Sequence, residues 1–182
     1  NKALALAGVT VSQLDRVDVY SCFPSAVQVA VAELGLDDTK PLTITGGLTF
    51  GGGPLNNYVM HSIAKMVELS RLHPSEIGLI TANGGYLTKH AFGVYSATAP
   101  AQDFQFADVQ DAVDAEPTRT VLQDYDGPAT VESYTVMYGP EGPKAGHLVC
   151  LTPAGERVWA NVEDPAEWVV MTESETCGRA VM

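Results

Sequence analysis

The sequence predicts an α/β protein, in which a mixed sheet with helices against it is followed by a small antiparallel β domain. Over residues 1–97, strand-like runs alternate with helix-like segments, which is the pattern of a layered α/β sheet. Residues 98–128 lose this alternation and are rich in Asp, Gln, Pro and Ala, as linkers often are. Residues 129–182 contain short alternating runs separated by glycine and proline turns, which predicts a small barrel or sandwich.

Glycine and proline mark the first elements. A helix is predicted over residues 2–7 and ends at Gly8, because glycine accepts the left-handed conformation that often follows a helix. The alternating run 16–20 predicts a short strand. Residues 24–34 predict a second helix, which begins with proline at its usual first position and is followed by glycine. This helix is so apolar that we expect it to be largely buried.

A glycine-rich stretch separates the next two elements. Residues 41–45 form another β-type run and predict a strand, whereas residues 46–54 contain five glycines within eight residues. Backbone with so many glycines turns sharply or approaches another group closely. A helix follows Pro54, and we expect it to bury one apolar stripe. That stripe consists of Met60, Ile63, Ala64, Met66, Val67 and Leu69.

Two strands complete the first part of the chain. They are predicted over residues 75–82 and 91–95, and the glycine-containing break at 83–85 follows the first of them. We expect the second strand to pair with the first as its neighbour.

The remaining sequence predicts a linker and a second domain. Within the linker, 98–128, an amphipathic stretch near residues 109–113 indicates a short helix. We expect residues 129–182 to form an OB-like antiparallel β domain, with Trp159 and Trp168 as core or edge residues of it.

The composition excludes several classes of function. Hydrophobic residues make up 46% of the chain and charged residues 18%, so the chain can bury a core. The net charge of −12, with no cluster of Lys and Arg, opposes binding to nucleic acid or to anionic membranes. No stretch reaches the roughly 18 consecutive apolar residues of a membrane span.

The cysteines point to a reducing compartment. Cys22, Cys150 and Cys177 lie far apart and include no CxxC pair, which argues against a disulfide framework and against a zinc site. We therefore expect a cytoplasmic protein without a metal. The chain starts with Asn1 and with a helix that is already under way, so we also expect it to begin inside a larger protein.

Three loops carry a resemblance to a known family. They occur in the order and spacing of the C-terminal half of the thiolase superfamily, which carries an Asn-Glu-Ala-Phe loop (His-Asp-Cys-Phe in the sterol-carrier-protein type), a Gly-His-Pro loop and a Cys-x-Gly loop. The resemblance covers residues 1–97, and the remainder is similar to the additional C-terminal domain of certain bacterial thiolase-like proteins, often described as acetyl-CoA acetyltransferases. The loops are Tyr20-Ser21-Cys22-Phe23, Thr45-Gly46-Gly47 with Gly52-Gly53-Pro54, and Asn83-Gly84-Gly85.

The resemblance implies an acyltransferase of lipid metabolism that handles acyl-CoA, with coenzyme A as its cofactor. Thioester condensation needs a nucleophilic cysteine, a base beside the reacting carbon and an oxyanion hole. In the family the nucleophile lies in the N-terminal half, so the resemblance implies that this half is a partner of the chain and that the fragment alone is inactive. It leaves open whether the protein forms a homo-oligomer.

Several positions depart from the family pattern. Gly53 aligns with the histidine of the Gly-His-Pro loop, and Thr81 aligns with the cysteine of the Cys-x-Gly loop. Tyr20 and Ser21 replace the His and Asp that precede the cysteine of the first loop. Cys22 matches that cysteine, which is thought to act as acid and base in the sterol-carrier-protein type.

The candidate residues each have a structural alternative. Cys22 is an acid/base or reactive thiol before a helix, or else a small buried residue at a turn. The other loop residues line a thioester pocket, or else they form tight strand-to-helix connections. Tyr20 and His90 are secondary candidates for the site. His90 either replaces the missing imidazole or is an exposed strand histidine. The pocket residues are Gly52, Gly53, Pro54, Asn83, Gly84 and Gly85.

Two functions therefore remain open from the sequence. One is acyl transfer with Cys22 as the acid/base, and the other is a binding module that holds acyl-CoA or a protein without catalysis. The departures at Gly53 and Thr81 favour the second, and the presence of Cys22 favours the first.

Overall fold

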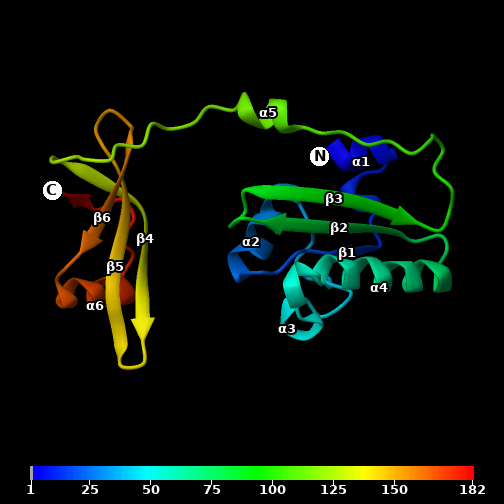
Figure 1. The fold of residues 1–182 in the computed structure, drawn as a ribbon, viewed down its shortest axis with the longest axis horizontal. Helices are drawn as coiled ribbons and strands as arrows, with labels where there is room; N and C mark the ends of the chain where they lie inside the picture. The colour runs from blue at the N-terminus through cyan, green and yellow to red at the C-terminus, as the bar shows by residue number, and fades with distance from the viewer. Residues whose placement is uncertain (1) are drawn as a thin grey trace. The chain divides into compact units, whose positions relative to one another are not determined.

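The computed structural model describes residues 2–182, which divide into two compact units. The first unit ends at Val109 and the second runs from Gln110 to Met182 (Figure 1). Each has its own sheet, and the predicted α/β class with a C-terminal β domain is confirmed. None of the helices in the described part of the chain has the length and apolar character needed to cross a bilayer.

The first unit contains a mixed three-stranded sheet with the strand order β1-β2-β3. Strand β1 (Arg16–Asp18) lies parallel to β2 (Ile77–Gly84), and β3 (Lys89–Ser96) pairs antiparallel with β2. The prediction that the last two strands are neighbours is confirmed, and β2 extends through Gly84.

Helices and short turns complete the first unit. Helix α4 packs against β2 and β3, and α1 packs against β3 (Figure 1). The predicted boundaries of α1 and α2 agree with the structure, because Gly8 and Gly35 both adopt the left-handed conformation. The elements are α1 (Lys2–Ala7), η1 (Val11–Gln13), α2 (Pro24–Leu34), α3 (Leu48–Gly51), η2 (Pro54–Asn56) and α4 (Tyr58–Leu72).

One burial prediction for these helices was wrong and another was correct only in part. Helix α2 buries Ala26 but leaves Val29 50% exposed, so it is not largely buried. The apolar composition of a helix does not say how many of its faces find a partner. Helix α4 buries Met66 of the predicted stripe but leaves Met60 and Val67 exposed, and it also buries Tyr58 and Ser62. Two of these buried side chains carry hydroxyl groups, which apolar periodicity cannot identify.

The strand predicted over residues 41–45 was also wrong. The segment is irregular and is joined to the end of β1 by one backbone hydrogen bond, from Val19 N to Leu42 O at 2.9 Å. Its other polar groups bind a carboxylate instead of a neighbouring strand: Thr43 Oγ1 and Ile44 N each donate to Asp18 Oδ2 at 2.9 Å. Side chains that capture a segment in this way compete with the hydrogen bonds of a sheet.

The second unit is built on an antiparallel sheet of order β6-β5-β4-β7. Helix α6, which the sequence did not lead us to predict, packs on β5 and β4. The core of this unit consists of the buried residues Ala129, Val131, Leu148, Cys150, Val158 and Met171. The elements are α5 (Gln110–Asp114), β4 (Ala129–Gly139), β5 (Gly142–Leu151), β6 (Arg157–Val162), α6 (Pro165–Glu173) and β7 (Ala180–Val181).

Helix α6 docks where β5 has no side chain. A Cβ atom added at Gly146 would lie 2.9 Å from Trp168 Cδ1 and 3.1 Å from Met171 Sδ. The indole of Trp168 also donates a hydrogen bond to the carbonyl of Val162, at 2.7 Å. The glycine thus allows two large side chains of the helix to approach the sheet closely. Trp168 is the anchor of α6, whereas Trp159 is an exposed residue and not part of the core.

Candidate functional site

The structure joins the first and third predicted loops through a side-chain hydrogen bond. The thiol of Cys22, just beyond β1, donates to Asn83 Oδ1 near the end of β2, at 3.2 Å. The two residues are 61 positions apart in sequence. They meet because β1 and β2 are parallel neighbours, so their carboxyl ends lie at the same edge of the sheet. Cys22 is half-buried.

The side-chain oxygen of Asn83 thus accepts a hydrogen bond from the thiol. An asparagine side chain also has two N–H donors, and no described residue accepts a hydrogen bond from those of Asn83. The pair therefore offers a thiol of fixed orientation together with amide donors for a carbonyl oxygen.

Tyr20 and Thr81 hold the first loop against β2. Thr81 is buried, and its hydroxyl accepts a hydrogen bond from the backbone N–H of Tyr20 at 2.9 Å. The ring of Tyr20 packs edge-on against Tyr58, with ring centroids 5.5 Å apart. Both residues hold the first loop on the sheet, and Thr81 does not present an acid or base to a ligand.

The glycine-rich loop is joined to the first loop by Ser21. The backbone N–H of Leu48 donates to Ser21 Oγ at 3.0 Å. Gly47 has φ +75°, and a Cβ added there would lie 2.7 Å from the same oxygen. The close approach of the two loops therefore requires glycine at this position.

The end of the glycine-rich loop is less crowded. Gly53 has φ −141°, and a Cβ added there would meet Leu48 Cδ2 at 3.5 Å, an ordinary contact. The position therefore lacks an imidazole, although the first carbon of a side chain would fit there. Gly52 has φ +64° at the end of α3, and Pro54 begins the turn η2.

Gly84 ends β2 and Gly85 lies in the turn that follows it, whereas His90 is the second residue of β3. His90 pairs with Asn83 in the β2–β3 ladder, but its Nε2 lies 2.8 Å from the carbonyl oxygen of Leu87. A carbonyl only accepts, so Nε2 carries the proton and donates. The imidazole ring stacks on Phe92. In this structure His90 supports the turn, and its Nε2 is not directed at Cys22.

A buried carboxylate, which sequence reasoning missed, holds the loops in place. Asp18, the last residue of β1, is completely buried. Its Oδ1 accepts hydrogen bonds from Ser62 Oγ at 2.6 Å and from Tyr58 OH at 2.8 Å. Its Oδ2 accepts those from Thr43 and Ile44 described above. Asp18 thereby ties β1 to α4 and to the start of the glycine-rich loop.

Tyr58 is suited to this arrangement. Burial raises the pKa of its phenol, so the hydroxyl stays protonated and donates to Asp18 Oδ1. A signal for this cluster was present in the sequence, since a charged residue lies in the middle of the apolar alternation at 16–20. Its partners, however, come from two other segments, which no local pattern connects.

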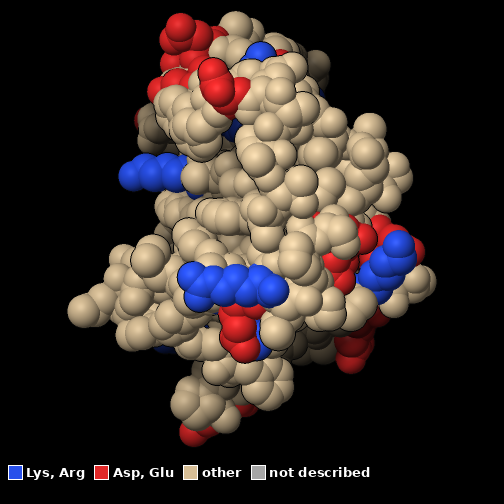
Figure 2. All heavy atoms as spheres, turned by 90° about the vertical axis from the view of Figure 1, so that its right-hand side faces the viewer, with Lys and Arg blue, Asp and Glu red and all other residues tan. Residues whose placement is uncertain are grey.

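The surface of the first unit carries no concentration of positive charge on the face seen in Figure 2. There the Lys and Arg side chains lie apart from one another, among mostly uncharged residues. Among the described residues, no group of three or more His, Cys, Asp or Glu side chains has the arrangement of a metal site.

Comparison with known proteins finds a family model that matches the second unit and a solved structure that is similar to the chain. Residues 108–182 match the family model of the thiolase-like protein type 1 additional C-terminal domain. A solved structure, a monomeric SCP2-thiolase-like protein type 1 from Mycobacterium smegmatis, is 35% identical with a TM-score of 0.87. The match covers 99% of this chain and 41% of that one, so the chain spans less than half of the solved protein. A search of curated proteins finds no match. The chain is therefore a relative of the thiolase superfamily, and its residues 108–182 correspond to the additional C-terminal domain of thiolase-like proteins type 1.

Proposed function

We propose that this chain is the C-terminal part of a cytoplasmic thiolase-like acyltransferase and binds the thioester of acyl-CoA at the Cys22–Asn83 pair. The hydrogen bond between these residues carries the proposal, because it fixes a thiol and an amide side by side at the carboxyl edge of the sheet. An amide donor next to a thioester oxygen stabilises the negative charge that develops there.

The rest of the site would come from a thiolase N-terminal half. That half would supply the nucleophilic cysteine, and the cleft between the halves would hold coenzyme A. The chain has a net charge of −12, so the phosphates of coenzyme A would need positive potential from that half or from backbone N–H groups. In the reaction, Cys22 would first lose its own proton to solvent, and the thiolate would then accept the proton beside the carbonyl group and return it in a later step.

A non-catalytic binding module is the second candidate, and one observation favours it. Gly53 has no side chain and Thr81 is buried with its hydroxyl bound to backbone. Neither position offers a group that could exchange a proton at neutral pH. Such a protein would hold acyl-CoA at Cys22 and Asn83 without turning it over.

Binding of acetyl-CoA by the full-length protein, measured by titration calorimetry, tests the shared part of both candidates. We expect a micromolar Kd for acetyl-CoA. Asn83→Ala should raise this Kd about tenfold, which corresponds to the loss of one hydrogen bond to the thioester oxygen. Asn161→Ala is the matched control, since Asn161 of β6 bonds Trp159 in the other unit. If acetyl-CoA does not bind, or if both variants bind equally, the proposal is wrong.

Turnover then separates the two candidates. Acetoacetyl-CoA and coenzyme A are added to the full-length protein, and the loss of acetoacetyl-CoA is followed. For an acyltransferase, Cys22→Ala abolishes turnover while the Kd for acetyl-CoA changes little. For a binding module, the native protein and Cys22→Ala both bind and neither turns over.

A further inference from the structure

Strand β6 has an open edge in the second unit, because it is an outer strand of the sheet β6-β5-β4-β7. In an antiparallel pair, successive residues direct their backbone N–H and C=O groups alternately toward the neighbouring strand and away from it. Arg157 directs its groups away from β5: its N–H donates to Thr120 O at 2.8 Å, and its carbonyl accepts from Leu122 N at 2.9 Å. The backbone groups of Trp159 and Asn161 therefore also point away from β5.

The segment that covers the start of this edge, residues 120–128, leaves it after a single bridge. Val121 and Arg157 form that bridge, and the two chains run parallel there. Among the described residues, no backbone hydrogen bond from this segment continues the pairing to Trp159 or Asn161. Beyond Arg157, the edge of β6 is thus free to pair with another extended chain.

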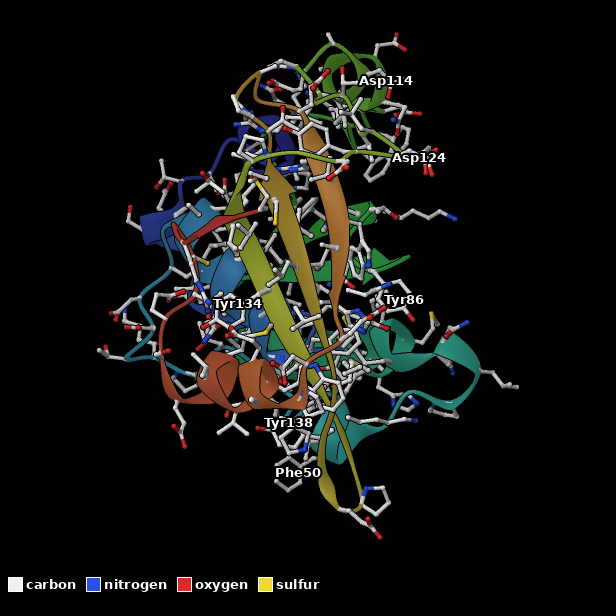
Figure 3. The ribbon with its side chains drawn as sticks, turned by 90° about the vertical axis from the view of Figure 1, so that its left-hand side faces the viewer. Phe50, Tyr86, Asp114, Asp124, Tyr134 and Tyr138 are labelled. Carbon is white, nitrogen blue, oxygen red and sulfur yellow. The ribbon has the colours of Figure 1, made fainter. Side chains whose placement is uncertain are left out.

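A cavity of about 300 Å³ lies between this segment and β6. The apolar part of its lining includes Ala129, Cys150 and Val158, which belong to the core of the unit. Asp124 and Asp126 line it from the segment, and Figure 3 shows Asp124 at the end of the unit where β6 begins. The cavity next to the open edge therefore combines apolar side chains with two carboxylates.

The second unit carries most of the negative charge of the chain. Residues 110–182 contain 13 Asp and Glu but only 4 Lys and Arg, and all three arginines form ion pairs with glutamates of the same unit. Asp124 and Asp126 form no ion pair with a described residue. A cationic side chain of a binding partner would complement these two carboxylates.

We propose that the edge of β6 binds an extended basic peptide of a partner protein by strand addition, with a Lys or Arg side chain in the adjacent cavity. The peptide would run parallel to β6, as residues 120–122 do, and would bond the free backbone groups of Trp159 and Asn161. Because side chains alternate between the two faces of a strand, every second side chain would face the cavity and its carboxylates. This surface belongs to the second unit alone, so the inference does not depend on the acyl-CoA site.

Binding of short peptides to the full-length protein tests this inference. The probe is a fluorescein-labelled peptide of sequence Lys-Val-Lys-Val-Lys-Val, compared with Glu-Val-Glu-Val-Glu-Val, and fluorescence anisotropy gives each Kd. We expect the basic peptide to bind more tightly by about tenfold or more, since each of two carboxylates contributes up to about fivefold.

Modified peptides test whether backbone pairing is involved. The basic peptide is N-methylated either at its lysines or at its valines, and one of these two sets carries the N–H groups that face β6. We expect one of the two methylated peptides to bind about tenfold more weakly than the unmodified peptide. Strand addition is excluded if both bind as tightly as the unmodified peptide.

Variants of the protein test whether the peptide binds at this cavity. Asp124→Asn combined with Asp126→Asn should raise the Kd of the basic peptide about tenfold. Glu141→Gln combined with Glu173→Gln is the matched control, because it removes the same charge from exposed residues that do not line the cavity. Equal Kd values for the two double variants would overturn the proposed site.

Hydrogen exchange identifies the edge that is occupied. Saturating basic peptide should slow exchange of the amides of Trp159 and Asn161 in the full-length protein, and unchanged rates would overturn the proposal. If these amides are instead protected without peptide and light scattering shows a dimer, a second copy of the chain occupies the edge and the proposed partner is wrong. The proposal also fails if neither unmodified peptide binds, or if both bind equally.

Discussion

Asp18→Ala is expected to destabilise the first unit by about 4 kcal/mol, the sum of several buried donors that lose their acceptor. The carboxylate accepts hydrogen bonds from Tyr58, Ser62, Thr43 and the backbone of Ile44. Alanine would remove this acceptor from the fully buried hydroxyls of Tyr58 and Ser62 and from the half-buried Thr43 and Ile44. Since a domain of this size is stable by only about 5–15 kcal/mol, a loss of this size exposes the unit to local unfolding.

Hydrogen exchange measures this effect separately in each unit. In Asp18→Ala, the amides of β1, β2 and α4 should exchange much faster, whereas those of β4 and β5 should keep their rates. Asp37→Ala is the control, because Asp37 is an exposed carboxylate that bonds only within its own turn. Equal exchange in the two variants would show that Asp18 does not hold the first unit together.

Gly146→Val is expected to displace α6 from the second sheet and to destabilise that unit by about 3 kcal/mol, the upper range for overpacking. The first added carbon already lies 2.9 Å from Trp168 Cδ1 and 3.1 Å from Val162 Cβ, and valine adds two methyl groups. The indole of Trp168 would lose its hydrogen bond to Val162 O.

Melting and tryptophan fluorescence report this change. Gly146→Val should melt at a lower temperature and shift its tryptophan emission to longer wavelength, because Trp168 becomes exposed. Gly139→Val is the matched control, since a Cβ at Gly139 meets nothing closer than 3.7 Å. Equal melting temperatures of the two variants would show that the close contact at Gly146 does not hold α6 on the sheet.

Elements with local start and stop signals were predictable from the sequence. Helix α2 begins at Pro24 and ends before a left-handed glycine, as its sequence predicts. Helix α6 had comparable signals that were missed: Asp164 caps it by accepting from Ala166 N at 2.9 Å, and Pro165 is its first residue. An aspartate followed by proline is a helix start that sequence rules describe.

Features that depend on distant segments were not predictable. The segment 41–45 has the residues of a strand, but its polar groups bind Asp18, from a different element. The same is true of the candidate site. Sequence pattern placed Cys22 and Asn83 in separate loops, and only the pairing of β1 with β2 brings the thiol to the amide.

Two of the loop positions that depart from the thiolase pattern have structural roles. Thr81 holds the backbone of Tyr20, and Ser21 binds the glycine-rich loop. These contacts hold the first loop, which carries Cys22, against β2 and against the glycine-rich loop.

Protection of Cys22 from alkylation tests the central claim, that acyl-CoA occupies the site at this thiol. The full-length protein is treated with iodoacetamide with and without acetyl-CoA, and labelling of each cysteine is followed by peptide mass spectrometry. Cys177 is exposed and serves as the internal control, whereas Cys150 is buried and its pKa is raised by burial. We predict that saturating acetyl-CoA slows labelling of Cys22 at least tenfold and leaves Cys177 unchanged. Equal labelling of Cys22 with and without acetyl-CoA would contradict the claim.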